Sequence, residues 1–107
     1  MKTEPLIFLL TVILPFTCLT DNSFGYSESD LQKLLSTKEC VGCDLSGADL
    51  SGLDLREADL TKANLSKADL TKAKLITTNL TKAKLTQAKL RKANLKGTNL
   101  KNTKGRF

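Results

Sequence analysis

"ADLTKANLSKADLTKAKL", residues 58–75, repeats a pattern of five residues. Each repeat holds a small residue, a polar residue that is Asp, Asn or Lys, and then a leucine. The same spacing runs through most of the chain. It places twelve leucines five residues apart, and we predict that they form a core ladder: Leu45, Leu50, Leu55, Leu60, Leu65, Leu70, Leu75, Leu80, Leu85, Leu90, Leu95 and Leu100.

A period of five fits neither an α-helix nor a continuous β-strand. Five steps of about 100° would scatter the leucines around a helix, and an odd step changes face in a strand. Within one repeat, however, the small residue and the leucine are two apart and share a face of extended backbone, and the last two residues must turn a corner. The pattern therefore predicts a solenoid that has a short strand and a corner in every repeat, with leucines inside and Lys and Asp outside.

The pattern over residues 39–103 resembles that of the pentapeptide-repeat family. The resemblance implies an all-β solenoid, a right-handed quadrilateral β-helix with four repeats per coil, so twelve leucines make about three coils. Coils should stack about 4.8 Å apart, with each leucine over the leucine twenty residues earlier. The segment "LLSTKECVGCDLSGADL", residues 34–50, also resembles the start of exported pentapeptide proteins that are abundant in cyanobacteria.

The N-terminus is predicted to be a signal peptide, residues 1–25. Its apolar run, residues 6–16, has the length of a signal-peptide core and is short for a membrane span. Ser23 and Gly25 suit cleavage after Gly25, and cleavage after residue 20 is a second register. The rivals are an uncleaved anchor and a lipoprotein at Cys18, although Pro15 and Thr17 fit a lipobox poorly. The expected location is therefore outside the cytoplasm, in the periplasm or thylakoid lumen if the source is a cyanobacterium.

The two ends of the repeat differ in sequence. Residues 26–38 predict a short helix with Ser27 or Ser29 as N-cap and with Leu31, Leu34 and Leu35 on one face. We expect it to cover the first coil, and a partner-binding helix is the alternative. In the tail, residues 104–107, one alternative is that Phe107 folds over the open coil; otherwise leucines and a ladder edge would be exposed there. The family resemblance implies a homodimer through this C-terminal end.

Two cysteines mark the first corner of the repeat. Cys40 takes a leucine position and Cys43 takes a small inward position, so both should face the core. Two cysteines without histidine do not complete a zinc site within one chain. A reactive thiol would be exposed at a helix N-terminus, whereas this pair follows a helix. A disulfide that locks the helix to the first coil and a pair of core thiols both remain open, and thiol-redox activity is an alternative function.

Charge is divided unevenly along the predicted solenoid. The formal net charge is +6, but residues 39–69 hold seven acids against three bases, and residues 70–107 hold eleven bases and no acid. The simplest explanation of this charge distribution is a solvated surface without a binding role. The alternatives are contact with an anionic surface and head-to-tail attraction between opposite ends of two rods. The candidate basic contact surface consists of Lys84, Lys89, Arg91, Lys92, Lys96 and Lys101.

The residue types argue against catalysis. The chain has no histidine to act as a base or to activate its many hydroxyl groups, and a filled solenoid offers no pocket. We therefore predict no enzyme activity, no cofactor, no metal and no specific nucleic-acid binding. The expected function is that of an exported interaction or scaffold module whose protein partner is unknown. The alternative is a basic C-terminal end that anchors the rod to an anionic membrane or polyanion.

Overall fold

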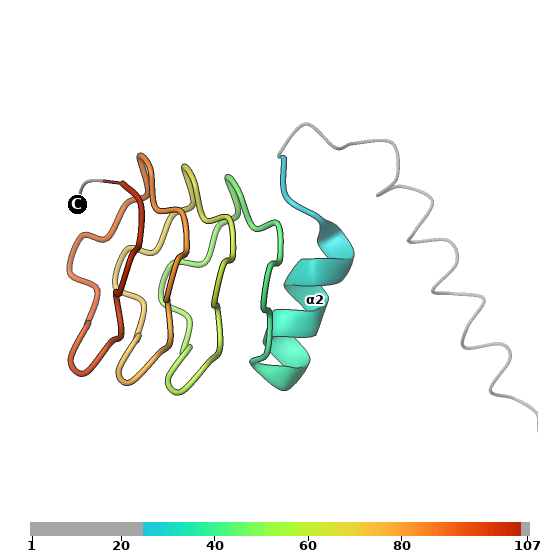
Figure 1. Ribbon diagram of the computed structural model, residues 1–107. Coiled ribbons are helices and arrows are strands. Elements are labelled where there is room, and N and C mark those ends of the chain that lie inside the picture. Colours follow the sequence, from blue (N-terminus) through green and yellow to red (C-terminus); the bar gives the residue numbers. More distant parts are fainter. Residues whose placement is uncertain (1–24, 106–107) are drawn as a thin grey trace, which may run out of the picture.

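The computed structural model describes residues 25–105, which form a stack of coils beside one helix. The helix α2 lies at one end of the stack, and the C-terminal coil lies at the other (Figure 1). Most of the predicted signal peptide and the last two residues of the tail lie outside the described residues. No helix among residues 25–105 is long and apolar enough to cross a membrane.

The coils are defined by parallel backbone bridges between residues twenty apart. One column joins Asp44 to Asn64, Asn64 to Lys84, and Lys84 to Lys104, and similar bridges recur every five residues. Twenty residues per coil and one bridge every five residues give four sides. The bridges are isolated single pairs. The prediction of a short strand in every repeat is therefore wrong in one respect, because residues 25–105 contain no continuous β-strand. A corner in every repeat leaves one bridged residue on each side.

Neighbouring coils are joined by a fixed set of backbone hydrogen bonds. The Leu65 N–H donates to the Lys84 carbonyl at 2.8 Å, and the Lys67 N–H donates to the Thr86 carbonyl at 2.9 Å. In return, the Lys84 N–H donates to the Ala63 carbonyl at 2.9 Å. Each side of a coil therefore gives two N–H donors to the next coil and one carbonyl acceptor. This ladder makes the two ends of the stack chemically different.

Each corner needs a left-handed backbone residue two positions after the leucine. Lys62 and Lys67 hold φ values of 61° and 62°, and the turn is closed at the next residue, as where the Ala68 N–H donates to the Leu65 carbonyl at 3.0 Å. Side chains other than glycine adopt this conformation at a cost. Gly47, at φ 73°, occupies the same position without that cost. The ladder between coils must therefore hold several corners in a conformation that their residues disfavour.

The leucines fill the interior of the stack. Leu45 to Leu85 of the ladder are buried, and most have no exposed surface. Alanines at 48, 58, 63, 68, 73 and 83 line the same core. Full burial of one leucine side chain contributes about 1.5–3 kcal/mol, so the interior supplies the main stabilisation of this fold.

The helix α2, Glu28–Thr37, begins as the sequence predicts and packs through fewer leucines than expected. Ser27 is the N-cap, and its hydroxyl accepts a hydrogen bond from the Asp30 N–H. Leu34 is fully buried and Leu31 partly buried, but Leu35 is 48% exposed. The prediction that Leu35 shares their buried face is wrong because Leu35 lies about 100° further round the helix than Leu34.

The start of α2 also pairs with the edge of the first coil. The Ser27 N–H donates to the Asp44 carbonyl at 2.9 Å, and the Asp44 N–H donates to Asp30 Oδ2 at 2.9 Å. At this position, the segment takes the place of a preceding coil. The helix thus supplies both an apolar contact, through Leu34, and hydrogen-bond partners.

The other end of the stack is the terminal coil, residues 85–104. Its last three ladder leucines, at 90, 95 and 100, are only partly buried, so the predicted twelve-leucine core is closed over its first nine members. The chain leaves the coil at Gly105, where an added Cβ would lie 2.7 Å from the Leu85 carbonyl carbon. No described residue forms a further coil below Leu90, Leu95 and Leu100.

Candidate functional site

The cysteines form a disulfide inside the first corner. Cys40 and Cys43 are bonded, with a Cα–Cα distance of 5.2 Å, and are 0% and 4% exposed. The corner also joins the next coil, because the Cys40 N–H donates to the Asp59 carbonyl and the Asn64 N–H donates to the Cys43 carbonyl, both at 2.8 Å. A buried disulfide has no thiolate to attack a substrate. This geometry suits a structural link more than a redox centre.

Metal-binding groups do not converge in the part of the chain that the structure describes. Residues 25–105 contain no group of three His, Cys, Asp or Glu side chains that are placed to hold an ion. The carboxylates of the first coil, Asp44, Asp49 and Asp54, lie on different sides and are engaged within their own corners. They therefore do not form a shared cation site.

The polar residue before each leucine builds the corner that follows. Asn79 Oδ1 accepts from the Thr81 N–H at 3.0 Å and from the Thr81 hydroxyl at 2.6 Å. Asp69 makes the same two bonds with Thr71, at 3.0 and 2.5 Å. The hydroxyl of Thr71, followed by its N–H, lowers the pKa of the Asp69 carboxyl below its ordinary value. Lysine cannot accept such bonds, so corners that follow lysine lack them.

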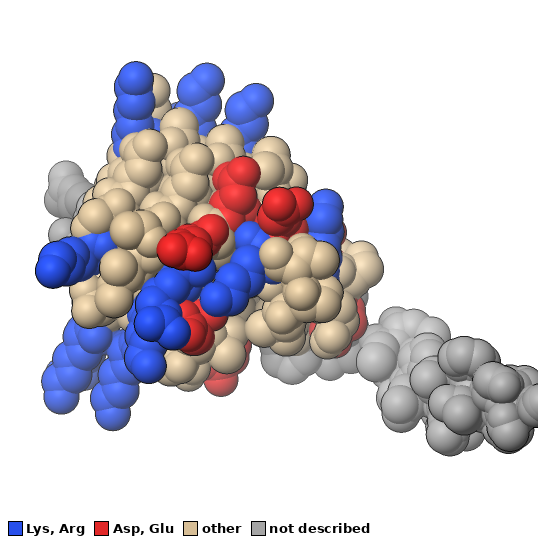
Figure 2. Space-filling view, turned by 90° about the horizontal axis from the view of Figure 1, so that it is seen from below, with Lys and Arg blue, Asp and Glu red and all other residues tan. Residues whose placement is uncertain are grey.

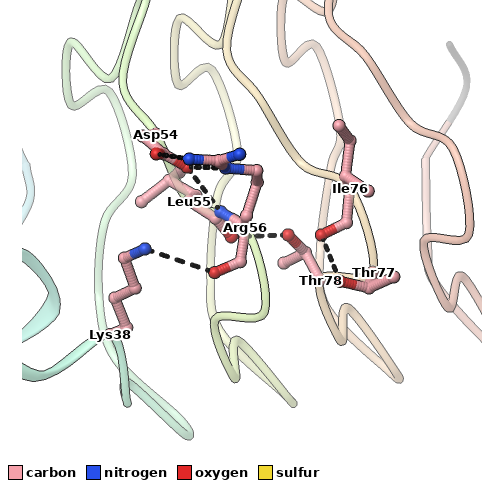
Figure 3. Close-up of polar contacts among 7 residues, drawn as sticks. All are labelled: Lys38, Asp54, Leu55, Arg56, Ile76, Thr77 and Thr78. Atoms are coloured by element: carbon pink, nitrogen blue, oxygen red, sulfur yellow. Dashed lines mark hydrogen bonds and ion pairs between the residues drawn. The ribbon is translucent and has the colours of Figure 1, made fainter.

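A variant of this corner occurs at Asp54, Leu55 and Arg56 (Figure 3). Arg56 Nε and Nη2 donate to the two Asp54 carboxyl oxygens at 2.8 and 2.6 Å, and the Arg56 N–H donates to Oδ1 at 3.1 Å. The side-chain hydrogen bond from Arg56 holds the pKa of Asp54 far below its usual range and raises that of Arg56. Both side chains are exposed, at 39% and 53%, so water screens their attraction.

The same corner borders a shallow depression lined by Lys38, Arg56, Glu57, Ile76 and Thr77. Lys38 Nζ donates to the Arg56 carbonyl at 3.4 Å (Figure 3). Ile76, which takes an outward position, is partly buried here. The guanidinium of Arg56 at this depression is already paired with Asp54.

A buried hydroxyl group links the coils beneath this depression. Thr78 is fully buried, and its hydroxyl donates to the Leu55 carbonyl of the preceding coil at 2.6 Å (Figure 3). Thr98 repeats the contact with the Leu75 carbonyl at 2.6 Å. Each replaces the usual small residue without leaving a polar group unpaired, so these residues hold the register of the stack.

The basic side chains surround the far end of the stack. In Figure 2, lysines and arginines project in several directions away from the α2 end, whereas the acids in view lie nearer to it. The six residues of the predicted contact surface are all exposed. They do not share one face: Lys84 and Lys89 lie at bridge positions on two different sides of the coil, and Arg91, Lys92, Lys96 and Lys101 occupy corners. The structure thus places them as a rim and not as a flat patch.

Within the part of the chain that the structure describes, the lower ladder groups of the terminal coil have no backbone partners. Among residues 25–105, no carbonyl accepts from the N–H groups of Leu90, Lys92, Leu95, Gly97, Leu100 and Asn102. The carbonyls of Ala88, Ala93 and Thr98 accept no N–H in the same set. In the coil above, the equivalent groups of Leu70, Lys72 and Ala68 are all bonded to the terminal coil. The open end therefore presents two donors for each acceptor, around three partly buried leucines.

Two features of the site had no place in the sequence interpretation. The left-handed corner position was missed, although glycines at 42, 47, 52 and 97 all fall on it and were its signal. The donor excess of the open end was also missed, because side-chain letters do not show the direction of backbone N–H groups. The register of twenty, once applied to the backbone, would have revealed it.

Comparison with known proteins gives a consistent family. The family model for pentapeptide repeats matches residues 39–75 and 78–104 in eight copies. A comparison with curated proteins finds no match. Among solved structures, a pentapeptide repeat protein (Rfr23) from the cyanobacterium Cyanothece 51142 is 39% identical over 64% of this chain and 47% of its own, with a TM-score of 0.61.

A second solved structure is a pentapeptide repeat protein from the thylakoid lumen of Arabidopsis thaliana. It is 32% identical over 64% of this chain and 45% of its own length, with a TM-score of 0.56. The chain therefore spans about half the length of these two solved structures.

Proposed function

Because this chain belongs to the pentapeptide-repeat family, we propose that it is an exported, non-catalytic interaction module that makes contact through its terminal coil. Proteins of this family fold as right-handed quadrilateral β-helices and are generally structural and non-enzymatic. Within residues 25–105, leucine and alanine side chains fill the interior of the coils, which favours a structural role over catalysis. In this view α2 is a cap that closes one end and directs contacts to the other.

One observation carries the proposal: the open end combines partly exposed leucines with ladder groups that have no partner among the described residues. Leu90, Leu95 and Leu100 retain exposed surface, and the ladder N–H groups beside them are unbonded within residues 25–105. Apolar surface and unpaired ladder edges both favour association. Export is supported by the apolar N-terminal run and by the lumenal source of one similar structure.

The test compares the full chain with two charge-bearing variants. Leu95→Glu alters the open end, and Leu35→Glu makes the same change at an exposed helix position. Each variant is checked for an unchanged circular dichroism spectrum and is then used for affinity capture from the extracytoplasmic fraction. We expect Leu95→Glu to lose the captured partners and Leu35→Glu to keep them. Equal capture by both variants would refute the terminal coil as the contact surface.

Export has a separate test. Cell fractionation of the full chain carrying a C-terminal tag should find it outside the cytoplasm and shortened at its N-terminus. A full-length product in the cytoplasm would contradict this part of the proposal.

Homodimerisation through the same end is the second candidate. Family resemblance suggests it, and the exposed leucines would be covered by a second copy. Sedimentation of the full chain and of Leu95→Glu distinguishes the cases, because only a dimer formed through this end dissociates in the variant. A monomer at every concentration would exclude it.

The thiol-redox alternative has weaker support, because Cys40 and Cys43 form a disulfide with almost no exposed surface. A turnover assay with an insulin substrate tests it. If the wild type reduces insulin and Cys40→Ser does not, the thiol-redox alternative would be supported.

A further inference from the structure

We infer that the terminal coil docks end-on to a bilayer that contains anionic phospholipid. This inference rests on the proposed role of that coil as the contact surface and names what it contacts. Three independent features of residues 85–104 support it: their charge, the direction of their backbone donors, and their apolar centre.

The charge of the terminal coil is of one sign. Residues 85–104 contain Lys89, Arg91, Lys92, Lys96, Lys101 and Lys104 and no acid. All six side chains are exposed: Lys89 and Lys104 lie on two sides of the coil, and the other four lie at the corners that follow residues 90, 95 and 100. Basic residues near an anionic lipid surface each contribute to binding, and the effect falls off within about 10 Å at 0.1 M salt. A rim around the end brings all of them to a flat surface together, whereas a side-on contact would not.

The backbone adds a second preference for phosphate. The open edge presents the N–H groups of Leu90, Lys92, Leu95, Gly97, Leu100 and Asn102, with half as many carbonyls. The equivalent N–H groups of Leu70 and Lys72 donate to carbonyls of the next coil, so these donors point along the stack axis. Phosphate oxygens accept hydrogen bonds and bring no donors. Oriented backbone N–H groups of this kind form anion-binding surfaces in other folds.

The centre of the end favours a lipid over a soluble polyanion. Leu90, Leu95 and Leu100 lie inside the basic rim, with Ala88 and Ala93 beside them, and all five are partly buried. An apolar centre with a cationic border suits the boundary between headgroups and acyl chains. The unbonded N–H groups keep the contact at the headgroup level, because unpaired backbone groups are costly in hydrocarbon.

A second copy of this chain fits the end less well. A like-end dimer would bring two rims of six cations together and would set one donor-rich edge against another. Like charges and unmatched donors both oppose such an interface. An anionic surface supplies the missing charge and the missing acceptors.

The experiment is co-sedimentation of the full chain with vesicles made of equal parts of phosphatidylcholine and phosphatidylglycerol. Vesicles of phosphatidylcholine alone show any binding through the apolar N-terminal run, which does not depend on anionic lipid. We expect tighter binding to the mixed vesicles, weakened by raised salt. Equal binding to both vesicles would overturn the inference.

Matched double variants locate the contact. Lys92→Gln with Lys101→Gln neutralises two residues of the terminal coil, and Lys33→Gln with Lys62→Gln removes the same charge from α2 and an earlier corner. We expect the first pair to weaken binding to the mixed vesicles about thirty-fold and the second pair to weaken it by a few-fold at most. Equal losses would show that net charge acts without an oriented end and would overturn the inference.

Two further experiments distinguish a bilayer from a soluble polyanion and from a protein as the ligand of the open end. If soluble polyphosphate displaces the chain from mixed vesicles and Leu95→Ser binds them as wild type does, the ligand is a soluble polyanion and the bilayer inference fails. If no vesicle binding occurs while capture of a protein still depends on Leu95, the inference fails and the proposed function stands. If the chain shows neither vesicle binding nor protein capture that depends on Leu95, the proposed function fails as well.

Discussion

The two ends of the stack carry the same repeat but are finished differently. At the α2 end, Leu34 covers the core, and both the N–H and the carbonyl of Asp44 have partners from residues 27–30. At the other end, Leu95 is partly exposed and its N–H has no described partner. The comparison teaches that the repeat propagates a core but does not terminate it. Termination needs a segment with a different pattern, and residues 25–105 supply one at a single end.

The largest expected effect contrasts the middle of the stack with its open end. Leu65→Ala removes a fully buried side chain and should lower the free energy of unfolding by about 2–5 kcal/mol. Leu95→Ala should cost about half as much or less, because this leucine is already partly in water. Urea titrations followed by circular dichroism measure both. Equal losses would show that the terminal coil is as closed as the middle.

The closed end offers the next contrast, within α2 itself. Leu34→Ala should destabilise the fold by about 2 kcal/mol or more, since Leu34 has no exposed surface. Leu35→Ala, at a side chain that is 48% exposed, should stay within about 0.5 kcal/mol of wild type. Thermal melts of the two variants measure both losses of stability. If both are neutral, α2 does not stabilise the first coil.

The disulfide should strengthen the same end. Closing a loop of about four residues limits the unfolded chain and should stabilise the fold by about 2 kcal/mol in the chain-entropy account. We expect the melting temperature of the wild type to fall in reductant, and that of a Cys40→Ser, Cys43→Ser double variant to be insensitive to it. An unchanged melting temperature in both conditions would show that the bond contributes no stability.

A smaller effect separates corners that have a side-chain acceptor from those that lack one. Asn79→Ala removes two hydrogen bonds to Thr81 and should cost about 1 kcal/mol. Lys84→Asn places the same acceptor before Thr86, in a corner towards the open end, and should add up to about 1 kcal/mol. Calorimetry should show opposite shifts in melting temperature. A Lys84→Asn variant that melts lower than wild type would contradict this account of the corners.

The smallest effect concerns acid, and it belongs to the α2 half of the stack. The pKa values of Asp49, Asp54 and Asp69 lie below the ordinary value of 3.8 in the fold. Because folding depresses these pKa values, their stabilisation is complete above that value and is lost as the pH falls below it. We expect a melting temperature that is level near neutrality and declines below about pH 4. The decline should be shallower in Asp54→Asn, and an identical decline would exclude this carboxyl as a contributor.

Most of the fold could be predicted because the five-residue pattern, with its leucine, recurs twelve times. The spacing of five, with a small residue two before eleven of the twelve leucines, predicts that both sets face inward, and the buried positions of Leu45 to Leu85 agree with it. Leu35 was assigned wrongly because Leu31, Leu34 and Leu35 spread over about 100° of the helix surface, which is wider than the strip that the first coil covers. Only the contact with the first coil selects Leu34.

The candidate site was less predictable for a physical reason. The basic residues could be read from the sequence, but their arrangement as a rim depends on which side of a coil each one follows. The donor excess at Leu90, Leu95 and Leu100 is a property of the backbone, shared by every residue type except proline. An interpretation based on side chains identifies the positive charge of this end but not the unpaired backbone N–H groups beside it.

The register of twenty residues has a consequence for how such a chain can change in length. Each column of outward residues, such as Asp49, Asp69 and Lys89, exists only because successive coils stay in phase. Insertion of one repeat would keep the leucines inside but would move every later residue to the next side of the stack. Insertion of four repeats would restore every column and add one layer. Lengthening by whole coils therefore preserves the surface pattern, whereas lengthening by single repeats rewrites it without disturbing the core.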